Sequence, residues 1–385
     1  MAARRQHGEG SVYQRGRRGG RGPQWVAVAD LGYRPGPHGK AVRDRREFTS
    51  LVSPKAAMDR RDRFLDRRRD GFTMPRGRQP YVSEWMLHWL HNVARRRVEA
   101  TTWHGSYRQK VTELICPWFE RVPLPELCEE DIEQWHAQLE AVISKRTGRP
   151  LSASTIGQAH RIFSTGIKEA VVRGKLPRNP VSNVTPPKAA RLVPEPPGRA
   201  EADRILARCG TWPNGARWVV ALKTGLRQGE ALALRWRDVR LTDPPSVTVS
   251  QAAARVAGER VVKAPKSAKS RRTIPLPGSA ARALLAHRQA QGVASLDGLV
   301  FTDRKGRPVH PRADWQDWQN LLADLGLPHY RVHDCRHAVA TMLLEEGTDP
   351  RVVQDVMGWS TLAMTEIYQH VRPALMTRAM DALDG

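Results

Sequence analysis

Cysteines, acidic residues and long apolar runs are all scarce in this chain of 385 residues. The four cysteines, Cys116, Cys128, Cys209 and Cys335, show no Cys-x-x-Cys spacing, which favours reduced thiols in a cytosol and argues against a structural zinc site. No apolar run approaches membrane-spanning length, and the arginine-rich N-terminus lacks the apolar core of a signal peptide. No repeat of about 20–50 residues is evident, which argues against a solenoid.

Acidic side chains are outnumbered by basic ones. The chain has 39 Asp and Glu against 63 Lys and Arg, and its formal net charge is +24. Residues 1–80 contain 20 basic and 8 acidic side chains, so half of the excess lies in about a fifth of the chain. Such concentration favours a polyanionic partner, and charge alone leaves both nucleic acid and an acidic membrane open. The 40% hydrophobic content is typical of a soluble globular protein, and the length allows two or three domains.

The first part of the chain predicts a small sheet backed by a helix. Alternating residues between Gly and Pro turns predict three strands, at residues 11–14, 25–31 and 42–49. Ser53 and Pro54 are typical of a helix start, and the helix is expected to run to about Asp70. The arginines crowded on that helix, and those in residues 1–20, suit either a solvated surface or direct contact with DNA.

Four helical patterns follow a Pro/Gly/Arg linker. Each pattern places large apolar side chains on one face, which at helical spacing indicates a core more than a base-stacking platform. The residues of these faces are Trp85, Met86, Trp89, Leu90 and Val93; Trp103, Tyr107, Val111, Leu114 and Ile115; Ile132, Trp135, Leu139 and Val142; and Ile156, Phe163, Ile167 and Val171.

Residues 184–199 contain five prolines and are predicted to be an interdomain linker that acts as a hinge. The segments beyond it are mixed. Helices are expected at residues 199–209, 212–224, 228–236, 278–291 and 311–325, and strands near residues 246–250, 259–264 and 271–276. The predicted fold class is therefore mainly α with small β elements (α+β).

The most informative stretch runs from His333 to Tyr368. His333, Arg336 and His337 open a helix whose apolar stripe ends near Gly347. A second short helix is expected from Asp349 and Pro350, which suit an N-cap and a first helical position, to Met357, and Gly358 closes it.

These residues carry a family resemblance. His333-x-x-Arg336, Gly358-Trp359 and Tyr368 nine residues later resemble the C-terminal signature of the tyrosine recombinases, the phage-integrase family. The run Thr224 to Glu230 is similar to the box that holds that family's first catalytic arginine. The run Ala264 to Leu276 is similar to its lysine-bearing β-hairpin.

The resemblance implies an architecture in three domains. Residues 1–72 would be a basic arm-site DNA-binding domain, residues 78–183 a helical core-binding (SAM-like) domain, residues 184–199 the linker and residues 200–385 the catalytic domain. The apolar C-terminal tail, Val371 to Gly385, would dock on a neighbouring subunit, as such tails do in the family.

The resemblance also implies roles for side chains. Arg227 and Arg336 would hold the phosphate, because guanidinium is planar, always charged and can bind two oxygens at once. Tyr368 would attack it as the nucleophile. Each residue read alone has a structural alternative: Arg227 pairs with Glu230 one helical turn on, and Tyr368 is a buried packing residue.

Proton transfer needs further groups. A phenol has an ordinary pKa of about 10, so Tyr368 needs positive surroundings or a base, and His333 can accept or relay the proton. Lys266 is the best candidate to protonate the leaving 5′-oxygen, with Lys263 and Lys269 as alternatives. Trp359 stands where the family more often has His; its indole N–H can donate to a phosphate oxygen but cannot shuttle a proton.

Phosphate contacts are predicted for basic side chains outside these boxes. The predicted DNA-binding residues are Arg15, Arg17, Arg18, Arg21, Arg95, Arg96, Arg108, Lys110 and Arg161. Neither a cofactor nor a metal is expected: His333 and His337 lack the glutamate of the zincin motif, and an arginine lies on their turn.

The sequence therefore predicts a site-specific recombinase that acts on double-stranded DNA at attachment sites through a 3′-phosphotyrosyl intermediate. We expect the integrase of a phage or integrative element, a homotetramer on DNA, aided by a host bending protein and an excisionase, in the cytoplasm and away from membranes. A type IB topoisomerase-like enzyme and a non-catalytic DNA-binding regulator are the alternatives. The sequence leaves open the attachment sites and whether Tyr368 acts in cis or in trans.

Overall fold

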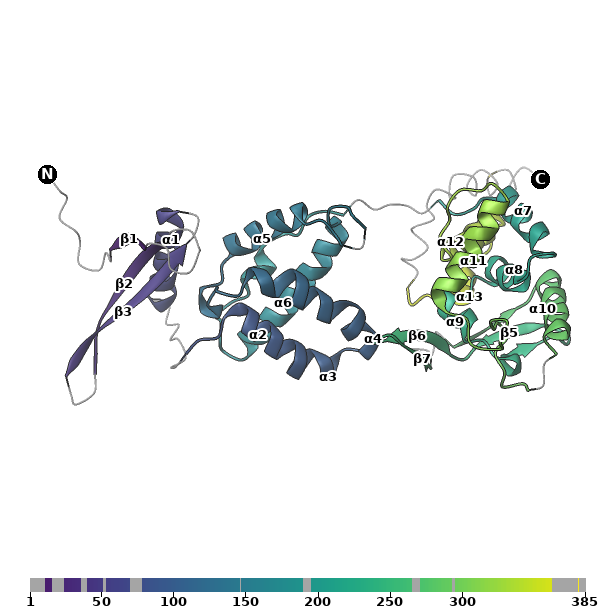
Figure 1. The fold of residues 1–385 in the computed structure, drawn as a ribbon, viewed down its shortest axis with the longest axis horizontal. Helices are drawn as coiled ribbons and strands as arrows, with labels where there is room; N and C mark the ends of the chain where they lie inside the picture. Colours follow the sequence, from purple (N-terminus) through teal and green to yellow (C-terminus); the bar gives the residue numbers. More distant parts are fainter. Residues whose placement is uncertain are drawn as a thin grey trace. The chain divides into compact units, whose positions relative to one another are not determined.

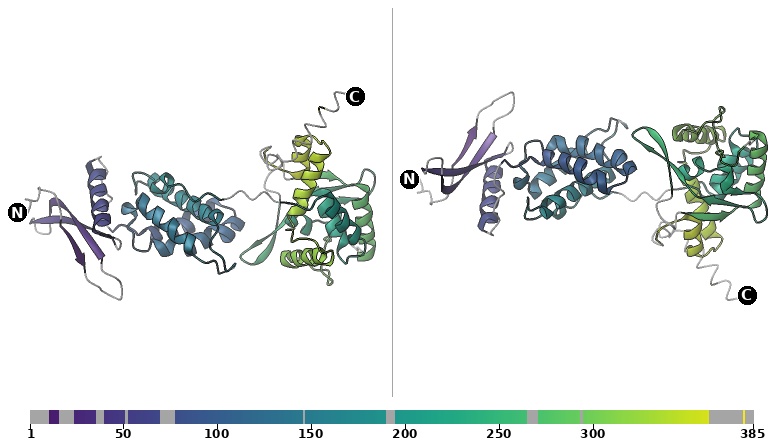
Figure 2. Two further views of the ribbon diagram at one scale, coloured as in Figure 1. Left: turned by 90° about the horizontal axis from the view of Figure 1, so that it is seen from above. Right: turned by 90° about the horizontal axis from the view of Figure 1, so that it is seen from below.

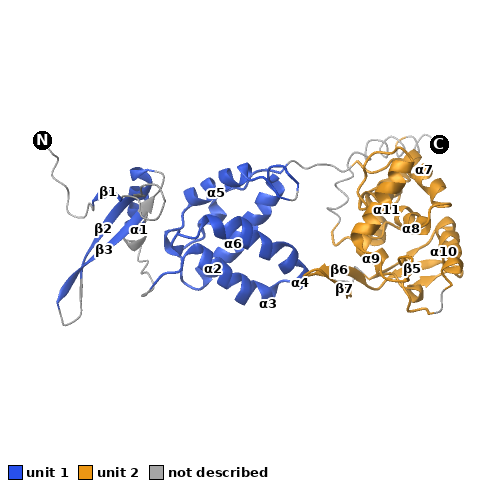
Figure 3. Cartoon of the chain, viewed as in Figure 1, with its two compact units in different colours: residues 1–190 blue, residues 191–385 orange. Residues whose placement is uncertain are grey.

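The computed structural model describes residues 11–15, 24–35, 40–50, 53–69, 78–145, 147–189, 195–264, 271–292, 295–361 and 380. The chain divides into two compact units, residues 1–190 and residues 191–385 (Figure 3). Over the described ranges helices dominate, and the strands form small antiparallel sheets (Figure 1). The predicted α+β class is confirmed.

The first unit begins with a three-stranded sheet in the order β1-β2-β3, and helix α1 packs against it. Phe48 on β3 is fully buried, and its ring centroid lies 5.1 Å from that of Phe64 on α1. The Ser53 hydroxyl accepts the Ala56 N–H at 3.1 Å, which starts the helix as the sequence predicts. The bounds are β1 Val12–Arg15, β2 Gln24–Pro35, β3 Ala41–Ser50 and α1 Pro54–Arg69.

A helical bundle completes the first unit, and the predicted apolar faces form its core. Trp85, Trp103 and Trp135 are buried and donate their indole N–H groups to backbone carbonyls, which confirms that these aromatic faces are core. The segments η2, η3 and η4 are π-helical, which the periodicity does not predict, whereas the short segments η5, η6 and η7 are 3-10 helices. The bounds are α2 Val82–Trp89, η2 Leu90–Ala94, α3 Arg95–Arg97, α4 Ala100–Thr102, η3 Trp103–Tyr107, η4 Lys110–Ile115, η5 Cys116–Trp118, η6 Leu124–Glu126, α5 Glu129–Ala141, α6 Ala153–Val172 and η7 Pro180–Asn183.

The second unit packs its helices around the fully buried Trp218 and Trp318, while a small sheet of order β4-β5-β8 contributes Val247 and Ile274 to the same core. Strands β6 and β7 form a separate hairpin that projects from the unit (Figure 2). The helices are α7 Arg199–Cys209, α8 Gly215–Thr224, α9 Gln228–Leu232, η8 Trp236–Asp238, α10 Gly278–Gln291, α11 Pro311–Asp324, α12 Asp334–Glu345 and α13 Pro350–Met357. The strands are β4 Val239–Arg240, β5 Ser246–Val249, β6 Ala252–Val256, β7 Glu259–Lys263 and β8 Arg272–Pro275.

Two details of this unit differ from the prediction. The helix expected over residues 228–236 ends early, because the Trp236 N–H donates to the Gly298 carbonyl at 3.0 Å and the Leu232 carbonyl accepts from Arg260 Nη2 at 2.9 Å, instead of bonding each other. Strand β6 was not expected, since it is rich in alanine, a residue that strands disfavour. It forms because Ala257 and Gly258, with φ of 52° and 93°, make the tight turn that pairs it with β7.

None of the helices in the described ranges is long and apolar enough to span a membrane. The predicted C-terminal tail lies outside the described residues, apart from Met380.

Candidate functional site

Arg227 stands at the N-cap of α9, two residues after the glycine that ends α8. Gly225 has a φ of 63°, a left-handed conformation that side chains with a Cβ rarely adopt. Its N–H bonds the Ala221 carbonyl at 3.1 Å, so the chain reverses sharply. A Cβ at this position would also lie 2.8 Å from the Met357 Cε. The tight turn that presents Arg227 therefore requires glycine at 225.

Glu230 caps the same short helix and pairs with Arg227. Its Oε2 accepts the Arg227 backbone N–H at 2.9 Å, and its Oε1 accepts the Arg227 Nη1 at 2.8 Å. The structural pairing that the sequence left open is thus present. The pairing leaves part of Arg227 accessible to a ligand, because 39% of its side chain is exposed, against 5% of the Glu230 side chain.

Arg272, at the start of β8, reaches the same carboxylate. Its Nη2 lies 3.0 Å from Glu230 Oε2 and its Nη1 lies 3.2 Å from Oε1. Burial alone would raise the pKa of Glu230, but the hydrogen bonds and charges of Arg272 and Arg227 lower that pKa below its ordinary value. The carboxylate therefore stays ionised and is shared by two cations.

Arg336 lies on α12 and is almost fully buried, with 2% of its surface exposed. Its Nη1 donates to the Gly225 carbonyl at 2.7 Å, and its Nη2 donates to the Met357 carbonyl. The guanidinium carbon also lies 5.8 Å from the centroid of the Trp359 ring. Arg336 is thereby fixed between the turn after α8 and the end of α13.

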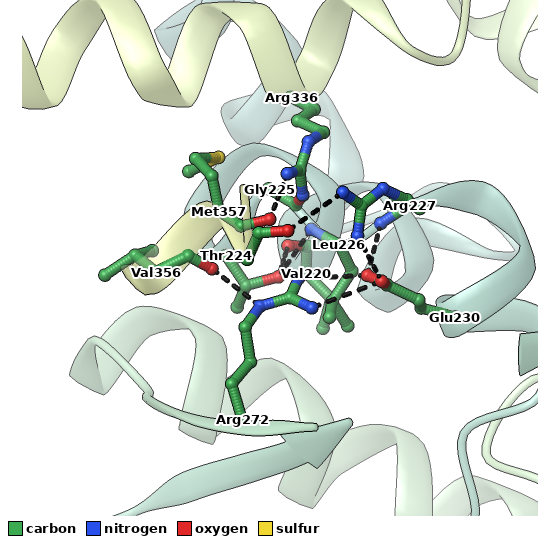
Figure 4. A network of polar contacts seen from close by, with 11 residues as sticks. Val220, Thr224, Gly225, Leu226, Arg227, Glu230, Arg272, Arg336, Val356 and Met357 are labelled. Atoms are coloured by element: carbon green, nitrogen blue, oxygen red, sulfur yellow. Dashed lines mark hydrogen bonds and ion pairs between the residues drawn. The ribbon is translucent and has the colours of Figure 1, made fainter. Parts of the chain in front are cut away.

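Three arginines from distant segments converge on the C-terminal end of α13 (Figure 4). Each donates to a backbone carbonyl there, at 2.8 Å for Arg272 Nε and 3.1 Å for Arg227 Nη2. The acceptors are the carbonyls of consecutive residues: Val356 for Arg272, Met357 for Arg336 and Gly358 for Arg227. The fold thus brings the two predicted arginines together, with a third beside them.

His333 occupies the N-cap of α12, and its ring lies edge-on to that of His337, with centroids 5.0 Å apart. His333 is exposed to solvent. Partial loss of hydration, together with the neighbouring His337, Arg336 and Arg227, lowers the pKa of His333 to about 4. At neutral pH the imidazole is therefore uncharged and can accept a proton.

Trp359 follows α13 directly and is buried, with 6% of its surface exposed. It packs with Val339, Leu344 and Met357 in a small apolar cluster. Its backbone N–H donates to the Gln354 carbonyl at 3.1 Å. The residue therefore has a packing role, and its ring also lies against the Arg336 guanidinium.

Three of the predicted active-site side chains, Lys266, Lys269 and Tyr368, lie outside the described residues. Lys263, the remaining candidate for the general acid, is half-buried at the end of β7.

The predicted DNA-contact residues differ in their surroundings. Arg15, on β1, is exposed and pairs with Glu47 at 2.6 Å. Lys110 is buried instead: its Nζ donates to the Ser106 hydroxyl at 3.2 Å, and burial lowers its pKa. The others on the bundle, Arg95, Arg96, Arg108 and Arg161, are exposed. Those of the N-terminal arm, Arg17, Arg18 and Arg21, lie outside the described residues.

The described residues contain no cluster of three or more His, Cys, Asp or Glu side chains that could hold a metal ion. The four cysteines are buried free thiols, and burial raises the pKa of Cys116 and Cys209 to about 12. Such thiols are poor nucleophiles and poor metal ligands.

Sequence reasoning assigned no role to Arg272, although it lies within the hairpin motif. Its partner Glu230 is 42 residues away, and the pairing depends on the tertiary fold. The local sequence Arg-Thr-Ile-Pro indicates a strand, but it does not indicate which way the Arg272 side chain points.

Comparison with known proteins agrees with this geometry. Residues 199–374 match the model of the phage integrase family. An integrase of Saccharopolyspora erythraea is 28% identical over 380 residues, covering 83% of this chain and 86% of that protein. An integrase of Streptomyces ambofaciens is 27% identical and covers 100% of this chain and 98% of its own length. Tyrosine recombinase XerC of Mycobacterium tuberculosis is 33% identical over 216 residues, covering 53% of this chain and 68% of the relative.

Solved structures share the fold. The Tn1549 transposon integrase in complex with a circular intermediate DNA matches 78% of this chain and 99% of its own, with a TM-score of 0.63 at 20% identity. A lambda integrase dimer bound to a COC′ core site matches 90% of this chain and 95% of its own, with a TM-score of 0.56 at 16% identity.

The family match and these relatives place the chain in a class of enzymes that break and rejoin DNA strands. The chain belongs to the tyrosine recombinases, the phage integrase family. It is a site-specific DNA recombinase.

Proposed function

We propose that this recombinase is the integrase of a mobile element, a phage or an integrative element, and that it cuts DNA with Tyr368. The observation that carries the proposal is the meeting of Arg227 and Arg336. Each comes from a different box of the sequence, and the two donate to the adjacent carbonyls of Gly358 and Met357. Two fixed guanidiniums at one helix end suit a single phosphate, because both are planar and always charged.

In the proposed reaction the Tyr368 oxygen attacks the phosphorus and the bond to the 5′-oxygen breaks, leaving a 3′-phosphotyrosyl ester. Negative charge grows on the non-bridging oxygens in the transition state, where Arg227 and Arg336 stabilise it. The bond energy is kept in the ester, so a second 5′-hydroxyl can rejoin the strand without ATP. Neither cofactor nor metal takes part.

The phenolic proton goes to His333. Its pKa of about 4 in the DNA-free protein leaves the ring neutral but weakly basic, and the negative charge of the bound phosphodiester would raise that pKa and favour the imidazolium that forms. Lys266 supplies the proton for the 5′-oxygen, with Lys263 and Lys269 as the alternatives to be tested. Trp359 covers Arg336 and donates its indole N–H to a phosphate oxygen.

The rest of the chain brings DNA to this site. Residues 1–72 bind arm sites, residues 78–183 bind the core site opposite the catalytic residues 200–385, and residues 184–199 link them. The exposed Arg15, the arm residues Arg17, Arg18 and Arg21, and the exposed bundle arginines contact phosphates. Lys110 would do so only if binding frees it from Ser106.

Recombination joins two duplexes, so we propose a homotetramer on DNA, with the C-terminal tail docking on a neighbouring subunit. Support comes from a solved structure, a lambda integrase tetramer bound to a Holliday junction. This chain shares the fold of that integrase with a TM-score of 0.53. A host bending protein and an excisionase are further expected partners, and the protein is expected in the cytoplasm on the nucleoid.

Trapping with a nicked suicide substrate tests the proposal. The wild type should form a DNA adduct that resists SDS, and Tyr368→Phe should form none. Tyr330→Phe is the matched control: the Tyr330 hydroxyl donates to Glu201 at 2.8 Å, and burial together with this bond raises its pKa to about 12, so it is a poor nucleophile.

The outcomes separate the alternatives. A regulator would form no adduct with any variant, and a topoisomerase would relax plasmid DNA that carries no attachment site. An adduct that persists in Tyr368→Phe would contradict the assignment of the nucleophile.

A further inference from the structure

The backbone carbonyls at the C-terminal end of α13 accept hydrogen bonds from arginine side chains. The last carbonyls of a helix lack partners within it. Here Gly358, with a φ of 59°, turns the chain, so that its own N–H bonds Asp355 at 3.1 Å and the next N–H bonds Gln354 at 3.1 Å. The carbonyls that follow are the ones that accept from the three arginines (Figure 4).

This arrangement suits cations for two reasons. The carbonyl end of a helix carries partial negative charge, which favours guanidinium groups. The carbonyls of successive residues are also held at a fixed spacing, so each arginine that donates to one is placed relative to the others. The carbonyls at the end of α13 thus hold the three guanidinium groups in fixed positions relative to one another.

Arg272 differs from Arg227 in what it can reach. Its side chain is only 7% exposed, whereas 39% of the Arg227 side chain is exposed. Its Nη1 and Nη2 bond both oxygens of Glu230 and its Nε bonds the Val356 carbonyl, so Arg272 joins the box of Arg227 to α13. Since all three guanidinium nitrogens already have these partners, Arg272 is not placed to bind DNA directly.

The packing confirms how closely Arg272 and α13 fit. A Cβ added at Gly358 would lie 2.9 Å from Arg272 Nη1 and 3.0 Å from its Cδ. Gly358 carries the carbonyl that holds Arg227, and Met357 before it carries the one that holds Arg336. A shift of the Arg272 guanidinium would therefore reach Arg227 through this turn.

We propose that Arg272 is a positioning residue for the recombination reaction, which orients Arg227 through Glu230 and through the end of α13. The inference rests on the proposed function, in which Arg227 and Arg336 hold the scissile phosphate. It assigns to strand β8 a task separate from that of the lysine in the hairpin motif.

Lysine cannot replace arginine in this task. The guanidinium donates to Glu230 through Nη1 and Nη2 and to the Val356 carbonyl through Nε. A lysine ammonium would have to donate to these partners from a single nitrogen. Arg272→Lys keeps the charge that Glu230 needs, so the unit should fold, yet it loses the geometry. Arg272→Met removes both the charge and the geometry.

The test measures single-turnover cleavage of the suicide substrate, with DNA affinity and the melting temperature of each full-length variant. We expect Arg272→Met to slow cleavage about 100-fold and Arg272→Lys at least about 10-fold, the range found for residues that orient others. DNA affinity should stay within about twofold, because Arg272 does not touch DNA.

A double-mutant cycle separates positioning from general damage. If Arg272 acts through Arg227, adding Arg272→Met to Arg227→Lys should slow cleavage by less than about threefold beyond Arg227→Lys alone. Arg235→Met is the matched control, since Arg235 pairs with Asp238 at 2.9 Å in the same unit and touches none of the site residues named above. Its effect on cleavage should be small and should multiply with that of Arg227→Lys.

Cleavage by Arg272→Lys at the wild-type rate would overturn the inference, and so would full multiplication of the Arg272→Met and Arg227→Lys effects. Either result would leave the proposed function intact if the wild type still forms its adduct and Tyr368→Phe does not. Absence of the wild-type adduct would overturn the proposed function and the inference together. Should Arg272→Met fail to fold, Arg272→Lys in the same cycle decides the matter.

Discussion

Two of the arginine–carboxylate clusters in the described part of residues 191–385 differ in the ratio of cations to carboxylates. Arg217 and Asp314 form a one-to-one pair, with bonds of 3.0 and 3.1 Å and side chains only 2% and 3% exposed. Glu230 instead serves both Arg227 and Arg272, at 2.8 and 3.0 Å. The first cluster is electrically balanced and closed, whereas the second holds a surplus cation whose side chain reaches the surface.

The difference shows what distinguishes a structural arginine from one available to a ligand. A buried balanced pair has compensated its own desolvation and has no charge to offer. A shared carboxylate leaves net positive charge, and the carbonyls of α13 hold that charge in place without neutralising it. An anion such as a phosphodiester is therefore the natural partner of the second cluster and not of the first.

The largest expected effect comes from removing the surplus cation. Arg227→Ala should slow single-turnover cleavage about 10³-fold, the size typical of a group that stabilises transition-state charge. Its melting temperature should change little, because much of the side chain is exposed. We would measure cleavage and thermal melting on one preparation of the variant. A loss of folded protein as large as the loss of cleavage would contradict this prediction.

Breaking the balanced pair should do the reverse. Arg217→Met leaves Asp314 buried and uncompensated apart from the Gln228 amide at 2.9 Å, so the free energy of unfolding should fall by about 3–5 kcal/mol. The cleavage rate of the folded fraction should remain near that of the wild type. Denaturant unfolding measures the stability of Arg217→Met, and cleavage assays at low temperature measure the activity of its folded fraction. A loss of cleavage without a loss of stability would contradict the difference expected between Arg217 and Arg227.

A smaller effect distinguishes the helical bundle from both clusters. His136 Nε2 and His160 Nδ1 lie 3.1 Å apart with both residues buried, and burial together with His136 lowers the pKa of His160 to about 4. Because the unfolded chain binds the proton first, stability falls as the pH drops from about 6.5 towards 4. The loss near pH 5 should be about 2 kcal/mol.

Hydrogen exchange of α5 and α6 at pH 7 and pH 5, corrected for intrinsic rates, measures this loss, and His160→Gln should reduce it. His333, whose pKa is also about 4, should cause a loss in the unit of residues 191–385 over the same interval. Glu230 should add none, because its pKa is lowered and its contribution is lost only as the pH falls through that depressed value. A loss in α5 and α6 that His160→Gln leaves unchanged would contradict the assignment to this histidine pair.

Local signals explain why much of the fold could be predicted. The Asp349 carboxylate accepts the Arg351 N–H at 2.6 Å and Gly358 takes the left-handed conformation, so α13 begins and ends where its cap residues indicate. The aromatic faces of the bundle are core because helical spacing alone places them on one side.

What could not be predicted depends on contacts between distant segments. Nothing near Arg272 in the sequence indicates that it turns towards Glu230, and the burial of Lys110 follows from how its helix packs. The boxes placed Arg227 and Arg336 in one site through resemblance, yet the carbonyls that order them are backbone groups with no sequence signature. Strand β6 depends on pairing with β7, which overrides the weak strand preference of its alanines.

The most direct test is to map the residue that becomes bonded to DNA. The adduct trapped on a suicide substrate is digested with protease and nuclease, and mass spectrometry locates the remaining nucleotide. The account predicts a phosphate ester on the Tyr368 oxygen that carries the 3′ end of the cut strand. A nucleotide on Tyr330 or on any other side chain, or a linkage to the 5′ end, would contradict it.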